Sequence, residues 1–147
     1  MTTAEQNAPA SPGVRAVRVL RGNCMGAAVL LIVQFGIGMG INLYVTLPQH
    51  KSFFSTVFGQ AAVAVHAIVA LLLLGASISA LVRAIRAGNQ TVITLTAVGL
   101  VAILVAAGSG AIFVNNGSNG ASLAMALATA VAMFSYLAAV FTLGQDS

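Results

Sequence analysis

The sequence predicts an all-α protein, a bundle of four transmembrane helices. The chain has 147 residues, of which 59% are hydrophobic and only 5% charged, and its mean hydropathy is +1.02. Soluble globular domains carry roughly 25% charged residues, so this composition excludes an ordinary soluble enzyme. The apolar runs are long enough for helices of about 20 residues that cross a bilayer. They lack the apolar/polar alternation that transmembrane strands require.

The N-terminal part, residues 1–20, is predicted to be a disordered cytoplasmic tail. It begins with many Ala, Thr, Ser, Pro and Gly residues and few large apolar ones, a composition typical of disorder. The membrane domain is expected over residues 21–144, and its first span over 24–47. Pro48 ends that span because proline lacks a backbone donor and disfavours helical geometry in the preceding residue.

Three further spans follow, over residues 60–85, 91–114 and 121–143. The connection between the last two contains Asn115-Asn116-Gly117-Ser118-Asn119-Gly120, a dense cluster of turn formers. Residues 145–147 form a short cytoplasmic tail. The sole cysteine, Cys24, permits no intrachain disulfide.

The distribution of basic residues predicts the orientation. Lysine and arginine collect at the cytoplasmic ends of spans, and five of the six basic residues fall at one predicted side of the membrane: Arg15, Arg18, Arg21, Arg83 and Arg86. Only Lys51 falls on the other side. Both termini are therefore expected in the cytoplasm. The compact chain with short connections and no organelle-type presequence favours a multi-pass protein of a bacterial plasma membrane.

Small residues at helical spacing predict close helix packing, within the chain or between copies. Helices in lipid associate through small residues that let backbones approach. The first span carries the G-x-x-x-G pair, and the third and fourth spans carry further small residues. The predicted packing residues are Gly36, Gly40, Gly108, Gly110, Ala124 and Ala128.

His66 is the only titratable side chain other than tyrosine that is well inside a predicted span. At a rise of about 1.5 Å per residue it lies roughly 9 Å below the outer start of the second span. Counting to the same depth along the other helices gives a layer of polar and sulfur-containing side chains. The candidate ligand-binding residues are His66, Met125, Asn42, Met39 and Ser109.

Several roles for His66 follow from this layer. In one, its ring is the metal ligand of a haem b iron, with Met125 or Met39 as second axial ligand. Gly108 and Gly110 would then leave room for the macrocycle, and Lys51 and His50 would contact the propionates. In another, His66 bonds to a backbone carbonyl or to Asn42 and fixes the register of the helices. A quinone, lipid or proton role completes the alternatives.

A family resemblance rests on the first two spans. The first span is rich in glycine and ends in Asn-x-Tyr-x-x-x-Pro, through Asn42, Tyr44 and Pro48, and an outer loop with His50 precedes His66. This order resembles small four-helix membrane proteins of the b-type cytochrome kind and one half of a haem A synthase. The resemblance implies a four-helix bundle with His66 at a haem-ligand position. An uncharacterised four-span family of bacterial plasma membranes is the alternative.

The functional expectation is a non-enzymatic accessory or binding module with a ligand pocket at His66 in the outer half of the membrane. Its expected partners are the lipid bilayer and a membrane protein or further copies of itself, not nucleic acid. A haem b-binding membrane cytochrome or haem carrier is one alternative. An oligomeric channel or transporter subunit is another, with a lining from Gln34, Thr94, Thr96 or Thr129. Enzymatic chemistry is disfavoured because the only acids, Glu5 and Asp146, lie in the tails.

Overall fold

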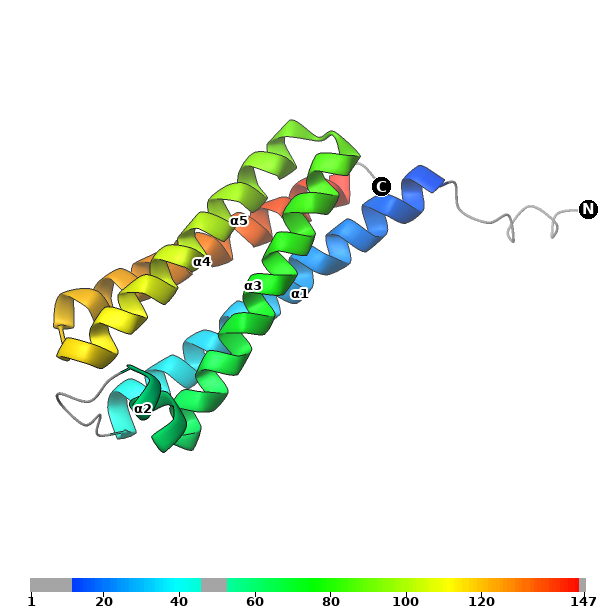
Figure 1. Ribbon diagram of the computed structural model, residues 1–147. Helices are drawn as coiled ribbons and strands as arrows, with labels where there is room; N and C mark the ends of the chain where they lie inside the picture. Colours follow the sequence, from blue (N-terminus) through cyan, green and yellow to red (C-terminus); the bar gives the residue numbers. More distant parts are fainter. Residues whose placement is uncertain (1–11, 46–52, 146–147) are drawn as a thin grey trace, which may run out of the picture.

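The computed structural model describes residues 12–45 and 53–145, and over these residues the protein consists of helices without strands. The elements are α1 (Pro12–Tyr44), α2 (Phe53–Gly59), α3 (Ala61–Ala87), α4 (Gln90–Asn116) and α5 (Asn119–Gln145). Four of them, α1, α3, α4 and α5, are long and apolar enough to cross a membrane. The predicted all-α bundle with four candidate transmembrane helices is thus confirmed at this level (Figure 1).

The four long helices form a closed ring. Helix α1 packs against α3 and α5, and α4 packs against the same two helices, so α1 lies opposite α4 and α3 lies opposite α5. The short helix α2 packs mainly on α3. The start of α1, the end of α5 and the α3–α4 connection share one end of the bundle, and α2 and the α4–α5 connection lie at the other end (Figure 1).

Short polar caps set the boundaries between the last three helices. Gly88 ends α3 in the left-handed conformation, with φ of 73°, and its N–H donates to the carbonyl of Ala84. The side chain of Asn89 then accepts a hydrogen bond of 3.2 Å from the N–H of Val92 and begins α4. Gly117 ends α4 with φ of 62°. These turns explain why α3, α4 and α5 begin and end within two residues of the predicted spans.

The N-terminal boundary was predicted wrongly. Residues 12–20 were expected in a disordered tail, but α1 begins at Pro12. Proline is favourable in a first helical turn, and Val17 and Leu20 continue the apolar face of the helix, with Leu20 only 1% exposed. Burial of these side chains stabilises the extra turns. At its other end, α1 stops at Tyr44, and the predicted end at residues 47 and 48 lies outside the described residues.

Helix α2 was not predicted. No element was assigned to the outer connection, and its second part forms a helix that buries Thr56 and Val57. Because α2 packs against α3 and α4, it covers one end of the bundle. The signal available in the sequence was the run of apolar side chains after Ser52, which is too short to cross a membrane.

Burial divides the bundle into two halves along its length. In the half next to the α3–α4 connection, all four long helices contribute buried residues, including Leu31, Leu73, Ile103 and Tyr136. We call this the core half. In the other half, residues 32–45, 61–72 and 104–127 of the long helices, only Val63 is buried among the described residues. We call this the open half.

Apolar side chains cover the outside of the bundle. Leu71, Phe134 and Phe141 are 69%, 74% and 71% exposed. A monomeric soluble protein rarely exposes large contiguous apolar patches, whereas the same surface suits the hydrocarbon of a bilayer. Together with the lengths of the helices, this surface suggests a multi-pass membrane protein.

Candidate functional site

A polar pair joins α1 to α3 inside the open half. The amide nitrogen of Gln34 donates to the backbone carbonyl of His66 at 3.0 Å and lies 3.1 Å from the ring Nε2 of the same residue. The amide nitrogen must face the carbonyl, because two carbonyl oxygens would both be acceptors. Its second hydrogen then points to Nε2, which accepts. The proton of the neutral imidazole is therefore on Nδ1.

Two polar atoms of this pair are left without a partner. His66 Nδ1 and Gln34 Oε1 are both buried, and neither makes a hydrogen bond among the described residues. His66 Nδ1 carries the ring proton and is a donor, and Gln34 Oε1 is an acceptor. Each buried and unsatisfied group costs about 1–3 kcal/mol. The site therefore lacks an acceptor for the proton on Nδ1 and a donor for Oε1.

Gly38 provides the surface on which the imidazole lies. A Cβ added to Gly38 would be 3.1 Å from His66 Cε1 and 3.8 Å from each ring nitrogen. Gln34 and Gly38 are four residues apart and so share one face of α1. Helix α1 therefore presents an amide to bond the ring and, one turn later, a glycine that lets the ring approach the backbone.

Other members of the predicted layer are placed elsewhere. Asn42 was the side-chain partner expected for a structural His66, but the partner is Gln34, and Asn42 is exposed. Met39 is 41% exposed on α1. Met125 belongs to α5, which lies opposite α3 in the ring, and its sulfur would be 3.3 Å from a Cβ added to Gly110.

Ser109 is partly buried on α4. The proposed propionate contacts His50 and Lys51 lie outside the described residues.

The predicted packing glycines divide into two groups. An added Cβ would meet nothing within 4 Å at three of them, Gly36, Gly40 and Gly108. The prediction allowed packing within the chain or between copies, and at these three positions the described residues make no such close contact within the chain. Gly110 does contact Met125 across the α4–α5 interface. Along α5, Ala128 is buried and Ala124 partly buried.

The closest helix approach was missed by the sequence analysis. A Cβ on Gly99 of α4 would be 2.6 Å from Cε2 and 2.9 Å from Cζ of Tyr136 on α5. Tyr136 is fully buried in the core half, where Ser77 is a polar neighbour of its hydroxyl. A lone glycine in an apolar helix was the available signal, but nothing in the sequence matched it to an aromatic residue on the next span.

The hydroxyl groups considered for a channel lining bond to their own helices. Thr94 donates to Gln90 O, Thr96 to Val92 O and Thr129 to Met125 O, at 3.0, 2.8 and 2.8 Å. Such bonds to the preceding turn satisfy a hydroxyl inside an apolar helix. They give no support to a polar path through the bundle.

Both ring nitrogens of His66 are engaged or protonated in the arrangement deduced above. Ligation needs a ring nitrogen with a free lone pair. Nε2 accepts from Gln34, and Nδ1 carries the proton in this arrangement. What the pair offers is hydrogen bonding, in a weakly packed part of the bundle.

Comparisons with protein-family models, with curated proteins and with solved structures found no match to this chain.

Proposed function

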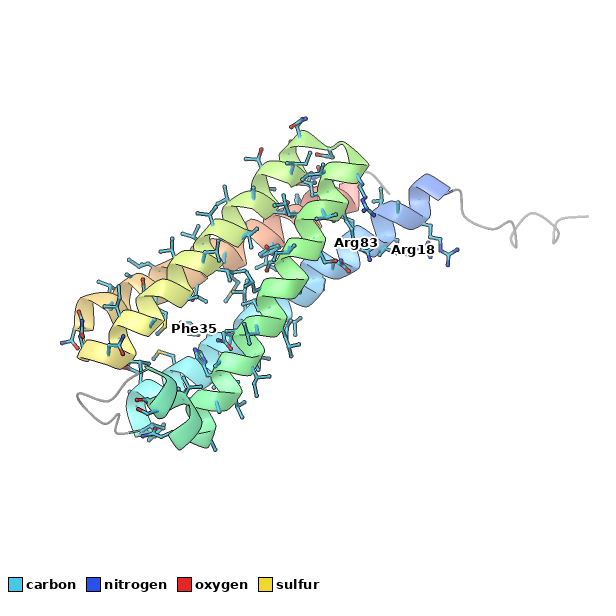
Figure 2. All side chains as sticks on the ribbon, in the orientation of Figure 1. Arg18, Phe35 and Arg83 are labelled. Atoms are coloured by element: carbon cyan, nitrogen blue, oxygen red, sulfur yellow. The ribbon has the colours of Figure 1, made fainter. Side chains whose placement is uncertain are left out.

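We propose that this chain is a multi-pass protein of a bacterial plasma membrane, with both termini in the cytoplasm, and that it is a non-enzymatic binding module. Four long apolar helices support the membrane assignment. The arginines of α1 and α3 lie at the end of the bundle that also holds the start of α1 and the end of α5 (Figures 1 and 2). The positive-inside rule supports a cytoplasmic location for that end.

The polar pair of Gln34 and His66 carries the proposal of a binding role. It has one unused donor and one unused acceptor in the open half, which would lie toward the outer face of the membrane. A hydroxyl group can both donate and accept. An apolar molecule with a hydroxyl group would therefore satisfy either atom or both, and would recover part of the cost of leaving them unpaired.

The open half supplies the route by which such a ligand would arrive. Both unused atoms are covered by surrounding groups, so binding requires side chains or helices in this half to move apart. Few buried contacts oppose that movement, because only Val63 of the long helices is buried there among the described residues. Phe35 of α1, labelled in Figure 2, is 43% exposed in this half of the bundle. A ligand entering from the bilayer would cover such apolar surface.

The test uses two probes that differ in one hydrogen-bond donor. Farnesol has an apolar chain and a hydroxyl group, and farnesyl methyl ether has the same chain without the donor. We expect calorimetric titration of the detergent-solubilised protein to show tighter binding of farnesol. His66→Leu and Gln34→Leu should remove this preference, whereas Thr94→Val, which removes a hydroxyl bonded only within α4, should retain it.

Equal binding of both probes by the wild type, or an unchanged preference in His66→Leu, would refute the proposed ligand class. The haem alternative has its own measurement, the absorption spectrum of protein expressed with supplied haem, oxidised and then reduced with dithionite. A Soret band that disappears in His66→Ala would replace the present proposal with a haem protein. We expect no such band, because the ring Nε2 of His66 already accepts a hydrogen bond from the Gln34 amide.

A second candidate function, an accessory subunit or homo-oligomer, is favoured by the unused glycines of α1. Gly36 and Gly40 form a G-x-x-x-G pair at which an added Cβ would meet nothing within 4 Å among the described residues, and such pairs support close contact between membrane helices. The doubly substituted Gly36→Leu, Gly40→Leu protein should then lose self-association or partner copurification in mild detergent. Gly75→Leu, at another open glycine position, is the matched control.

A further inference from the structure

Helix α2 lies across two of the long helices at the end of the open half. It packs against both α3 and α4, and Figure 1 shows it at the end of the bundle opposite the α3–α4 connection. At that connection, the short turn of Gly88 and Asn89 joins α3 directly to α4. At the other end the chain does not join these two helices directly, and α2 contacts both of them.

Burial in the open half is concentrated beside α2. Within α2, Thr56 and Val57 are only 1% and 9% exposed, whereas Ser55 of the same helix is exposed. Val63, four residues after the end of α2, is the one buried residue of the long helices in the open half among the described residues. Further along α3 the next buried residue is Leu73, in the core half. The docked face of α2 therefore supplies much of the packing in this half.

The junction between α2 and α3 has the features of a hinge. One residue, Gln60, separates the two helices, and its backbone is extended, with φ of −131° and ψ of 113°. Its side chain makes no capping hydrogen bond to α3. In contrast, the side chains of Asn89 and Ser118 accept from the N–H groups of Val92 and Ala121 in the first turns of α4 and α5. The cap that fixes the start of α4 thus has no counterpart between α2 and α3.

A short helix packed on two others restrains their separation. Few buried contacts oppose the opening of this half, and those of α2 are foremost among them. Hinges are commonly a few residues at the ends of elements that absorb a change of φ and ψ. We propose that α2 is a latch: docked through Thr56 and Val57, it holds α3 and α4 together in the open half, and rotation about Gln60 releases them. The purpose of the latch rests on the binding role proposed above, but its action is testable without a ligand.

Two substitutions of equal charge separate undocking of α2 from a change of charge. Val57→Asp replaces a buried apolar side chain of α2 by a charged one. Ser55→Asp introduces the same charge at an exposed position of the same helix and is the matched control. All proteins carry Cys24→Ala, so that only introduced cysteines react with a spin label.

The measurement is the distance between α3 and α4 by double electron–electron resonance in lipid nanodiscs, without ligand. Labels at Val65→Cys and Ile112→Cys report the open half, and labels at Val82→Cys and Val98→Cys report the core half; all four positions are exposed. We expect Val57→Asp to lengthen the open-half distance by about 4 Å, the contact distance of one further layer of carbon atoms. Ser55→Asp should give the wild-type distance, and the core-half distance should stay constant in both variants.

A milder variant covers the case in which Val57→Asp does not fold. Val57→Ala keeps an apolar but smaller side chain, and we expect it to populate both the short and the long open-half distance. An open-half distance that is the same in the wild type, Val57→Ala and Val57→Asp would overturn the proposal. Equal lengthening in Ser55→Asp, or lengthening of the core-half distance as well, would also overturn it, because α2 would then have no specific effect on the open half.

The same samples distinguish the latch from the ligand class proposed above. Faster association of farnesol with Val57→Asp than with Ser55→Asp would support both proposals. A longer open-half distance in Val57→Asp, with farnesol bound by none of the proteins, would support the latch and refute the ligand class.

Discussion

Replacing Gly99 by alanine tests the packing of the core half. The added methyl group would be 2.6 Å from Cε2 and 2.9 Å from Cζ of Tyr136. Ordinary contacts begin near 3.4 Å, so the ring would have to retreat by at least 0.8 Å, the difference between 3.4 and 2.6 Å. Tyr136 is 0% exposed and belongs to the buried cluster of the bundle. Because the ring is fully buried, such a movement requires neighbouring side chains to shift.

The expected loss of stability follows from overpacking. Forcing an additional carbon into a well-packed interior costs typically about 1–3 kcal/mol. Helix association in a membrane depends mainly on van der Waals contact and close backbone approach, so a clash at this contact directly lowers the stability of the bundle. We therefore expect Gly99→Ala to reduce the free energy of unfolding by about 2 kcal/mol, measured by steric trapping or by SDS-induced unfolding monitored by circular dichroism.

Double substitutions identify the ring as the cause. Tyr136→Phe keeps both clashing ring carbons, so it should not rescue Gly99→Ala. Tyr136→Leu removes them, and the doubly substituted protein should recover about 1 kcal/mol relative to the sum of the two single changes. Gly75→Ala, where the new methyl group meets nothing within 4 Å, should leave stability unchanged or raise it. A Gly99→Ala protein as stable as Gly75→Ala would refute the reasoning.

Three further predictions concern the turn and the polar pair. Gly88→Ala should cost about 1–2 kcal/mol in the same unfolding assay, because φ is 73° and alanine is strained there; Gly88→Asn should cost less, and equal losses would contradict this cause. Asn89→Ala should cost about 1 kcal/mol by removing the cap on Val92, whereas Asn89→Asp should retain most of the stability. Gly38→Ala should displace the imidazole of His66, since the new methyl group would be 3.1 Å from Cε1. Nitrogen NMR of ring-labelled histidine should show protonated Nδ1 in the wild type and a change of shifts in Gly38→Ala; unchanged shifts would mean that the ring does not lie on this glycine.

The sequence predicted the long helices well because their signals are local. A run of about 20 apolar residues suffices to identify a span, and turn formers such as Gly88 and Gly117 mark its end. The start of α1 was predicted wrongly because the amino-acid composition of this segment suggested disorder, whereas the burial of its apolar side chains stabilises a helix. Val17 and Leu20 are apolar but alternate with arginines, and only their packing against the bundle shows that the helix extends through them.

The candidate site could be predicted only in part, because its contacts join different helices. His66 was recognised as an unusual residue in its span, and Gln34 was named as a candidate for a channel lining. Their contact depends on the register between α1 and α3, which no local pattern encodes. For the same reason Gly36 and Gly40 were predicted to pack either within the chain or between copies, and an added Cβ at either position meets nothing within 4 Å among the described residues. Small residues indicate that close approach is permitted, not which neighbour approaches.

The unequal packing along the bundle connects the fold to the proposed function. A bundle whose only task was to hold four helices together would gain stability from burying side chains along its whole length, because each contact adds van der Waals attraction. Here the aromatic-on-glycine contact of Tyr136 and Gly99 and most buried residues lie in the core half. The polar pair lies in the open half, and its two unpaired atoms lower stability further. A part of a protein that must open for a ligand is necessarily less stable than its surroundings. The core half can then keep the bundle assembled while the open half rearranges, and this is the division of roles that a lateral binding site in a membrane requires.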